Sequence, residues 1–434
     1  MYQLKPFGVY ILDTVTGDPD SLARVERILA ALDLPLGTAR IFRADEAAEV
    51  IREVSAWVPD SGPAVPWQHQ RALVFTRIRI DRTERAEPLQ LAAGVSEASL
   101  RNVLGYLQLV RDTHAPADDE RANMVCWNTQ DFGVMHGCPH GCQYCGVGKS
   151  AKMTVIGTNL EEYMEKVVGP TIEAHPAQKC FRLLGWGADI ATFEPEYGAF
   201  ELFLAKLAEY EDRYGYFHTA GDNVDWIRDV PNRDRLIGVW SLTCKTGEEV
   251  VEPGSPTNAQ RIEAARKCQS WGLPVRFKFK PTIPVRNWRQ EYAQTIATIF
   301  RETTPESIGF CVLMWMTSDQ LCKKIDPDLL DPEFVVGARQ HAEELRDVRT
   351  GPFPHELRAT VYRFLIQEVR KHDAHVPLYI STESREMWEE LKGELGQNPG
   401  SFVCGCNPIQ APGPRMLPSG VLSRSTYRDA RRPG

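Results

Sequence analysis

Three regularly spaced cysteines lie in one short glycine-rich stretch, "HGCPHGCQYCGVGKS", which runs from His136 to Ser150. Cys138, Cys142 and Cys145 follow the pattern C-x3-C-x2-C. A structural zinc site takes four protein ligands, and a cluster of four irons usually has four cysteines. Three thiolates would therefore leave one position of a metal centre open. That position could bind a substrate or a cofactor.

Two other interpretations of this stretch stay open. A zinc ion could recruit His136 or His140 as its fourth ligand. The thiols could instead be buried without a metal, which we do not favour because glycine-rich loops bury poorly. The glycines suit a loop that wraps closely around a bulky group, and Tyr144 precedes the last cysteine, where its ring could cover a flat ligand.

The composition disfavours several classes of protein. The 434-residue chain is 43% apolar and 25% charged, as is ordinary for a globular protein. Its formal net charge of −8 disfavours wholesale binding to a nucleic-acid backbone. We find no secretory signal and no apolar run of about 18 residues, so we expect a cytoplasmic protein without a membrane span. The eleven cysteines should then be thiols or metal ligands.

The order of apolar patterns predicts a chain in four parts. Residues 1–114 alternate strand-like and helix-like stretches and form a small α/β module, in which the last helix covers 96–113. The polar residues 115–123 are the predicted linker. Residues 124–316 form the main domain, and residues 317–434 form a helical and loop extension with a disordered tail.

The main domain alternates strands and helices. We expect strands at 124–133, 180–188, 215–221, 235–243, 274–285 and 307–316, and helices at 159–174, 195–213, 257–272 and 288–303. Repeated βα units imply parallel strands with helices outside. Six strands are fewer than the eight of a closed barrel. The predicted fold is therefore an α/β partial (β/α)6 barrel, with the cysteine loop at the carboxyl end of its first strand.

A C-x3-C-x-aromatic-C motif after the first strand of a partial barrel resembles the radical S-adenosylmethionine (SAM) superfamily. The resemblance implies that Cys138, Cys142 and Cys145 bind a [4Fe–4S] cluster whose open iron binds SAM. An external one-electron reductant of the flavodoxin or ferredoxin type would reduce the cluster. The resulting 5′-deoxyadenosyl radical would abstract a hydrogen atom from a substrate.

A longer resemblance covers residues 124–316 and concerns the spore photoproduct lyase branch. "GDNVDWI", "IGVWSLTCKTGEEVVEPGSPTNAQRIEAARKCQSWGLPVRFKFKPTI" and "WRQEYAQTI" carry it. The family's hydrogen-donating cysteine near the end of strand two is missing from "LLGWGADI", and the net charge is acidic. The acidic charge, the missing donor cysteine and the lyase-like barrel together resemble the radical SAM diol dehydratases of aminoglycoside (apramycin-type) biosynthesis. That implies 3′-dehydration of an amino sugar such as paromamine, with a partner NAD(P)H dehydrogenase reducing the product.

The resemblance also implies residues that bind the cofactor. Each has an ordinary structural alternative: a tight turn after strand two, a buried hydroxyl at the end of strand four, or a solvated helix arginine. The predicted set is Tyr144, Gly185, Trp186, Gly187, Ser241, Thr243, Arg261 and Lys278.

Substrate-binding and catalytic residues are expected at the rims of strands two to five. Acidic groups there would hold ammonium groups, and the predicted substrate-binding residues are Asp189, His218, Asp222 and Glu249. The predicted catalytic residues are Tyr216, as a relay of an electron and a proton, Asp189 and Lys280. Hydrogen-bonded rim residues are the alternative. Cys404 and Cys406 ("CGC") could contribute to a second cluster only with further cysteines.

Three other functions remain as alternatives. They are repair of a DNA photoproduct, another radical SAM tailoring reaction, and a non-enzymatic iron–sulfur or zinc scaffold. Formation of 5′-deoxyadenosine after chemical reduction separates the scaffold from the others.

Overall fold

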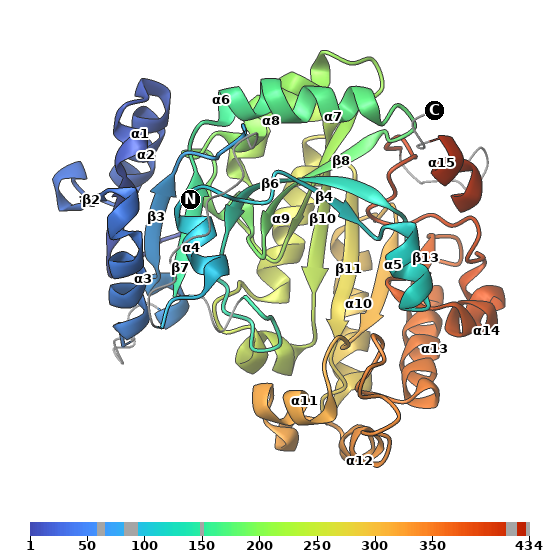
Figure 1. Cartoon of the computed structure of the whole chain (residues 1–434). Coiled ribbons are helices and arrows are strands. Elements are labelled where there is room, and N and C mark those ends of the chain that lie inside the picture. Colours follow the sequence, from blue (N-terminus) through green and yellow to red (C-terminus); the bar gives the residue numbers. More distant parts are fainter. Residues whose placement is uncertain (59–65, 82–93, 148–151, 414–422, 431–434) are drawn as a thin grey trace.

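The computed structural model describes residues 1–58, 66–81, 94–147, 152–413 and 423–430, except for the side chains of Gly185 and Trp186. Within these residues, twelve strands form one large, mostly parallel sheet in an α/β fold (Figure 1). Along its main path the order is β13-β12-β11-β10-β9-β8-β6-β7-β3-β1-β2, and β4 pairs with β6.

Six parallel strands lie side by side in the middle of this sheet. They are β6 (Thr129–His136), β8 (Cys180–Trp186), β9 (Tyr214–Thr219), β10 (Leu236–Leu242), β11 (Val275–Thr282) and β12 (Ile308–Val312), and β13 (Leu378–Ile380) extends them. They overlap the six stretches predicted from the alternation of apolar patterns, although the first strand begins at Thr129 rather than at residue 124.

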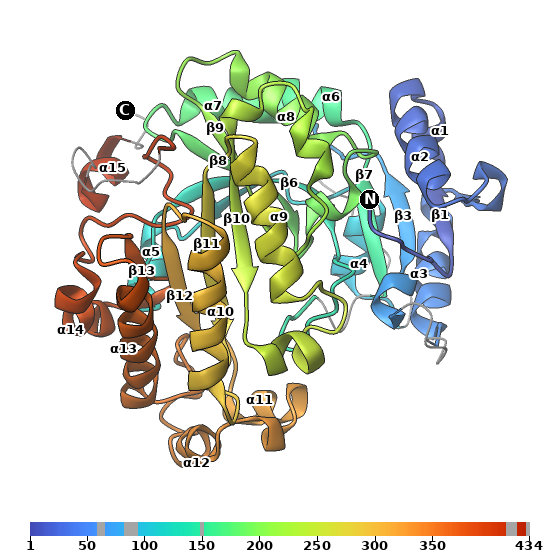
Figure 2. The same ribbon diagram turned by 180° about the vertical axis from the view of Figure 1, so that it is seen from behind.

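Helices cover the outer face of the six strands, and Figure 2 shows α9, α10 and α13 in front of β10 to β12. The helices that follow the first strands are α6 (Leu160–Tyr163), α7 (Gly169–Ala174), α8 (Ala199–Ala208), α9 (Asn258–Ser270) and α10 (Trp288–Glu302). Later helices are α11 (Ser318–Lys324), α12 (Pro332–Gln340), α13 (His355–His372) and α14 (Arg385–Leu395). The apolar side chains of the strands, such as Phe277 and Phe279 of β11, are buried.

The first part of the chain joins the same sheet. It contains β1 (Val9–Leu12), α1 (Asp13–Thr16), α2 (Pro19–Ala31), β2 (Arg40–Phe42), α3 (Ala47–Ala56), β3 (Ala72–Thr76) and α4 (Glu97–Val103). β3 pairs with β7 (Met153–Gly157), a strand that we did not predict, and β7 pairs antiparallel with β6. Hydrogen bonding is therefore continuous between residues 1–114 and the main domain. The four-part division stays a prediction.

Two local expectations were wrong, for the helix over 96–113 and for the tail. The helix predicted for 96–113 ends at Val103, because Gly105 turns the chain at φ 84° with only 2.0 Å between its ideal Cβ position and the Arg77 carbonyl oxygen. The chain then forms β4 (Val110–Thr113), antiparallel to β6. The predicted linker forms α5 (Pro116–Arg121) before β5 (Met124–Val125), which pairs with β14 (Glu383–Ser384). Residues 427–430 of the predicted disordered tail belong to α15 (Arg424–Ala430), whose Tyr427 is buried against Trp127, and residues 431–434 lie outside the described part.

Candidate active site

The cysteine loop leaves the carboxyl end of β6, as predicted. Two glycines fix its path. Gly137 has φ 99°, and an added Cβ would lie 2.5 Å from the Met153 carbonyl oxygen of the neighbouring strand. Gly141 has φ 64°, and an added Cβ would overlap the Gln68 side chain. Only glycine fits such close approaches in a left-handed conformation.

The three thiols line one small cavity of about 170 Å³. Burial, together with the nearby Asp189 carboxylate, raises the pKa of Cys138 to about 12, and burial also raises that of Cys142. Three thiolates in this cavity therefore need positive charge beside them. An iron–sulfur cluster supplies that charge, so the donor set fits such a group. The remaining lining comes from the loop and the ends of β8, β9 and β10: His140, Gly141, Gly187, Ala188, Asp189, His218, Thr219, Ala220 and Ser241.

The geometry does not favour a single zinc ion. Among the described residues, no group of three or more His, Cys, Asp or Glu side chains is close enough to hold one metal ion. His140 is already engaged, because its Nε2 lies 3.0 Å from Asp189 Oδ2 and its Nδ1 lies 3.2 Å from the Gly254 carbonyl oxygen.

A buried chain of polar contacts holds the loop from behind. The Tyr144 hydroxyl donates to Glu252 Oε1 at 2.7 Å, and Arg261 Nη2 donates to Glu252 Oε2 at 2.7 Å. Arg261 also donates to the Ser241 carbonyl oxygen at 3.0 Å, at the end of β10. Arg261, a predicted SAM-binding residue, is fully buried and is not part of the lining of the small cavity. It ties the loop to the strand instead.

The end of β8 contributes Gly187 and Asp189 to the small cavity. Gly187 has φ 64°, and an added Cβ would lie 2.5 Å from Val147 Cγ2 of the loop. Asp189 Oδ2 accepts from the Thr219 hydroxyl at 2.6 Å and from Ala220 N at 3.0 Å. Asp189 thus joins the ends of β8 and β9. The backbones of Gly185 and Trp186 pair with β6, but their side chains lie outside the described part.

At the end of β10, Ser241 faces the cavity and Thr243 does not. Ser241 Oγ lies 2.8 Å from Nε2 of His218. Thr243 is fully buried, and its backbone carbonyl accepts from Asn258 Nδ2 at 2.8 Å. Burial and the charges of Lys278, Arg182 and Lys280 hold the pKa of His218 well below its usual range. His218 is therefore a neutral imidazole at neutral pH.

His218 also lines a second, larger cavity of about 1260 Å³, and so connects the two spaces. Tyr216, Lys278 and Lys280 line this large cavity. Further charged lining comes from β4, α5, β8 and the segment before α13, namely Arg111, Asp112, Asp118, Asp119, Arg121, Arg182, Asp347 and Arg349. The large cavity has room for a substrate.

The two lysines of β11 lie on one face of the strand, as its period of two predicted. The Lys280 ammonium contacts the Ser381 hydroxyl at 3.3 Å and lies 4.9 Å from the centre of the Trp315 ring. Burial and the neighbouring Lys278 lower the pKa of Lys280. Lys278 lies 3.3 Å from Cys406 Sγ. Lys278 lines the large cavity rather than the small one, so it is not beside the three cysteines as a cofactor ligand would be.

Two predicted substrate-binding residues line neither cavity. Asp222 N donates to the hydroxyl of Tyr2, which belongs to the N-terminal segment lying across this edge. The Glu249 side chain is 57% exposed and its carboxylate lies 3.8 Å from Lys245. The charge of Glu249 is therefore directed to solvent, as is usual for a charged residue in a surface turn.

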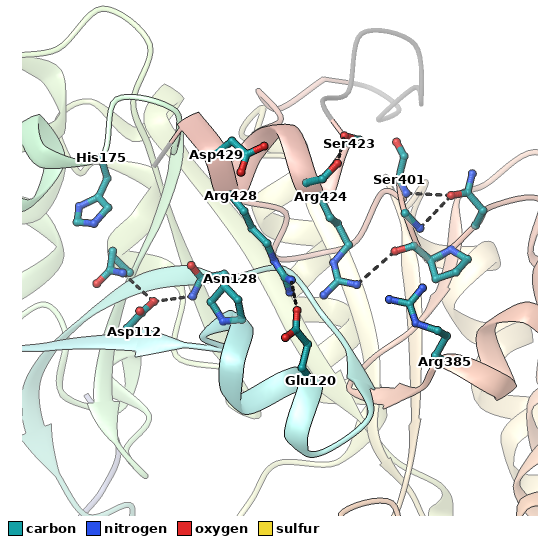
Figure 3. A pocket seen from close by; sticks show the side chains of 16 residues that line it. Asp112, Glu120, Asn128, His175, Arg385, Ser401, Ser423, Arg424, Arg428 and Asp429 are labelled. Carbon is teal, nitrogen blue, oxygen red and sulfur yellow. Dashed lines mark hydrogen bonds and ion pairs between the residues drawn. The ribbon is translucent and has the colours of Figure 1, made fainter. Parts of the chain in front are cut away.

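A third cavity, of about 730 Å³, lies away from the cysteine loop (Figure 3). Arg424 donates to the Pro399 carbonyl oxygen, and Arg428 pairs with Glu120 at 3.7 Å. Figure 3 shows these arginines, from α15, pointing toward α5 and the 398–401 turn. Because both arginines are paired with other groups of the protein, we assign no part of the site to this cavity.

Comparison with solved structures places the fold among known enzymes. The chain is similar to a variant of spore photoproduct lyase, with a TM-score of 0.60, 13% sequence identity, and coverage of 87% of this chain and 99% of that one. Two further structures of that lyase match with TM-scores of 0.59. One is complexed with a dinucleoside spore photoproduct, and the other is a variant with bound AdoMet and the dinucleoside spore photoproduct. At this identity the likeness establishes a shared fold.

No protein-family model and no curated protein sequence matched the chain. No helix in the described residues is long and apolar enough to cross a membrane.

Sequence reasoning missed four residues of the site. Glu252 is the buried ion-pair partner of Arg261, and Arg182, which is partly buried, pairs with the buried Asp131. Arg71, from the N-terminal part, is buried with its charge near all three loop cysteines. Cys406 lines the large cavity. The one available signal was the "CGC" motif, because the other three are charged residues without a local pattern.

Proposed function

We propose that this chain is a radical SAM enzyme built on a partial (β/α)6 barrel. Cys138, Cys142 and Cys145 hold a [4Fe–4S] cluster, and SAM binds in the small cavity beside Gly187 and Ser241. When bound, the cluster and SAM supply a 5′-deoxyadenosyl radical. The observation that carries the proposal is that the three thiols share one cavity with the ends of β8, β9 and β10, and that His218 connects it to the large cavity.

The large cavity holds the substrate, and its side chains are suited to the loss of water from a diol. His218 is neutral and can accept a proton from a hydroxyl, while Ser241 orients its ring. Lys280, with a lowered pKa, can donate a proton to a leaving hydroxyl. Tyr216 lines the same wall as a relay for an electron and a proton. These groups support 1,2-diol dehydration.

An amino sugar such as paromamine is the proposed substrate. Its ammonium groups need carboxylates, and the large cavity offers Asp112 and Asp347 in place of Asp189 and Glu249. Asp112 accepts from Gln130 Nε2 at 2.8 Å, and Asp347 is exposed at the rim. The proposed partners are an external one-electron reductant of the flavodoxin or ferredoxin type and an NAD(P)H dehydrogenase that reduces the product. The proposed location is the cytoplasm.

A second candidate is repair of a DNA photoproduct. One observation favours it: Lys278, Lys280 and Arg182 line the large cavity, and cations suit a phosphate-bearing substrate. The net charge of −8 argues against a DNA-binding surface.

The experiment compares both substrates under one set of conditions. Reconstituted protein is incubated with SAM and dithionite, and with either paromamine or a dinucleoside spore photoproduct. Mass spectrometry follows 5′-deoxyadenosine and any product lighter by one water. We expect both from paromamine, neither from Cys142→Ala, and unchanged amounts from Cys322→Ala, a cysteine of α11 that lines neither cavity. Wild-type protein that makes no deoxyadenosine would contradict the proposal.

A further inference from the structure

The "CGC" segment near the C-terminus reaches the wall of the large cavity. Cys406 is partly buried and lines the cavity, whereas Cys404 is buried behind it. Lys278 Nζ lies 3.3 Å from Cys406 Sγ. The two residues are 128 positions apart in the chain, so only the fold brings them together.

This contact pairs a thiol with a buried ammonium. Lys278 is 4% exposed, and no carboxylate lies within ion-pair distance of it among the described residues. Its other close neighbour is the Tyr379 ring, whose centre is 5.8 Å from Nζ. An unpaired buried ammonium is costly. A thiolate at Cys406 is the anion that the surroundings of Lys278 require.

The remaining neighbours of Cys406 also stabilise a thiolate. A hydrogen bond from Cys404, and then the charges of Lys278, Arg182 and Lys280, hold the pKa of Cys406 well below its usual range against the effect of burial. Low pKa makes a cysteine reactive. The same interactions, led by the Cys406 charge, keep the pKa of Lys278 raised although burial lowers it.

Cys406 also lies near the predicted relay residue. Tyr216 packs with Cys180, Ile237 and Val239 in a small cluster, and Cys406 packs against that cluster. Arg182 lies over the Tyr216 ring at 5.9 Å. The phenol and the thiol thus share one wall of the cavity, and the thiolate is the more readily oxidised group.

We propose that Cys406 and Lys278 together supply the electron and the proton that convert the product radical into the finished product. This rests on the proposed function. The Cys406 thiolate gives one electron to the carbon radical beside the carbonyl, which becomes an enolate. The Lys278 ammonium gives the proton that forms the new C–H bond. A thiyl radical and a neutral lysine remain. An external one-electron reductant of the flavodoxin or ferredoxin class and a proton from water restore the pair.

The first test needs no substrate. Holoprotein is treated with iodoacetamide at neutral pH, and peptide mass spectrometry gives the alkylation rate of each cysteine. We expect Cys406 to react at least tenfold faster than Cys322, and Lys278→Met to slow Cys406 about tenfold without changing Cys322. A Cys406 rate no greater than that of Cys322, or one unaffected by Lys278→Met, overturns the inference whether or not the chain is a dehydratase.

The second test measures product for each deoxyadenosine formed from paromamine. Cys406→Ser should keep SAM cleavage but lower this ratio at least tenfold, and Cys322→Ser should leave it unchanged. A wild-type ratio in Cys406→Ser overturns the inference while the proposed dehydration stands. Wild-type protein that cleaves SAM but leaves paromamine intact overturns both the dehydration and the reducing role of the pair.

Discussion

The two cavities that meet at His218 differ in size and in charge. The small one is formed by tightly turned backbone, three thiols and the Asp189 carboxylate, and it is braced by the buried Glu252–Arg261 pair. The large one is lined by lysines, arginines, carboxylates and the two cysteines Cys126 and Cys406. A small, closely fitted space suits a cofactor that is the same in every reaction cycle. A large space with many ionisable groups suits a substrate and its proton transfers.

The largest effect is expected from replacing a cysteine of the small cavity, because this should abolish the activity. Anaerobically purified wild-type protein should hold about four irons per chain. Cys138→Ala, Cys142→Ala or Cys145→Ala should lose the cluster and all formation of 5′-deoxyadenosine, whereas Cys404→Ala should keep its iron. Iron analysis and absorption spectra measure this. Loss of half the iron in Cys404→Ala would instead reveal a second cluster.

The buried Glu252–Arg261 pair behind the small cavity should contribute several kcal/mol to the free energy of unfolding. Glu252→Gln leaves Arg261 charged and buried without its partner, and breaking such a pair costs about 3–5 kcal/mol. Denaturant unfolding measures this loss. The matched control is Glu263→Gln, which breaks an exposed pair with Arg266 on the same helix and should cost less than about 1 kcal/mol. Equal losses in the two variants would mean that burial of the pair is unimportant.

Substitution of two aspartates should distinguish the roles of the two cavities. Asp347→Asn, at the rim of the large cavity, should raise the Michaelis constant for paromamine, since a charge-assisted contact is worth about 1.5–3 kcal/mol. Asp189→Asn should weaken SAM binding with little effect on that constant, because Asp189 lines only the small cavity. This reverses the role that the sequence suggested for Asp189. Steady-state kinetics and SAM binding decide, and the opposite pattern would exchange the two assignments.

The smallest effect concerns the pH dependence of stability. The pKa of His218 is lowered in the folded protein, so the unfolded chain binds a proton first as the pH falls. The free energy of unfolding should therefore decrease below the ordinary histidine pKa of about 6.5 and continue to decrease down to the folded pKa. His218→Gln should make this part of the profile flatter. Denaturant unfolding between pH 5 and 8, in steps of about 0.5, measures it. Equal slopes in the two proteins would place the cause elsewhere.

Local features of the chain predicted the motif and the main strands well. The six central strands and their helices follow from apolar patterning, because the spacing of apolar residues within each element reflects which of its faces is buried. β4 and β7 were missed because both are short and owe their pairing to distant partners, β6 and β3. The predicted helix over 96–113 failed at Gly105, where contact with Arg77 overrides helical periodicity.

The sequence by itself determined the spacing of Cys138, Cys142 and Cys145 and the strand that precedes them, because both depend on neighbouring residues. Only the tertiary structure decided that Arg261 binds Glu252, that Asp189 faces the small cavity, and that Cys406 meets Lys278. A charged or reactive side chain takes its role from the partner that burial forces on it. Lys278 and Cys406, for example, are 128 positions apart, so the pattern of neighbouring residues cannot reveal their contact.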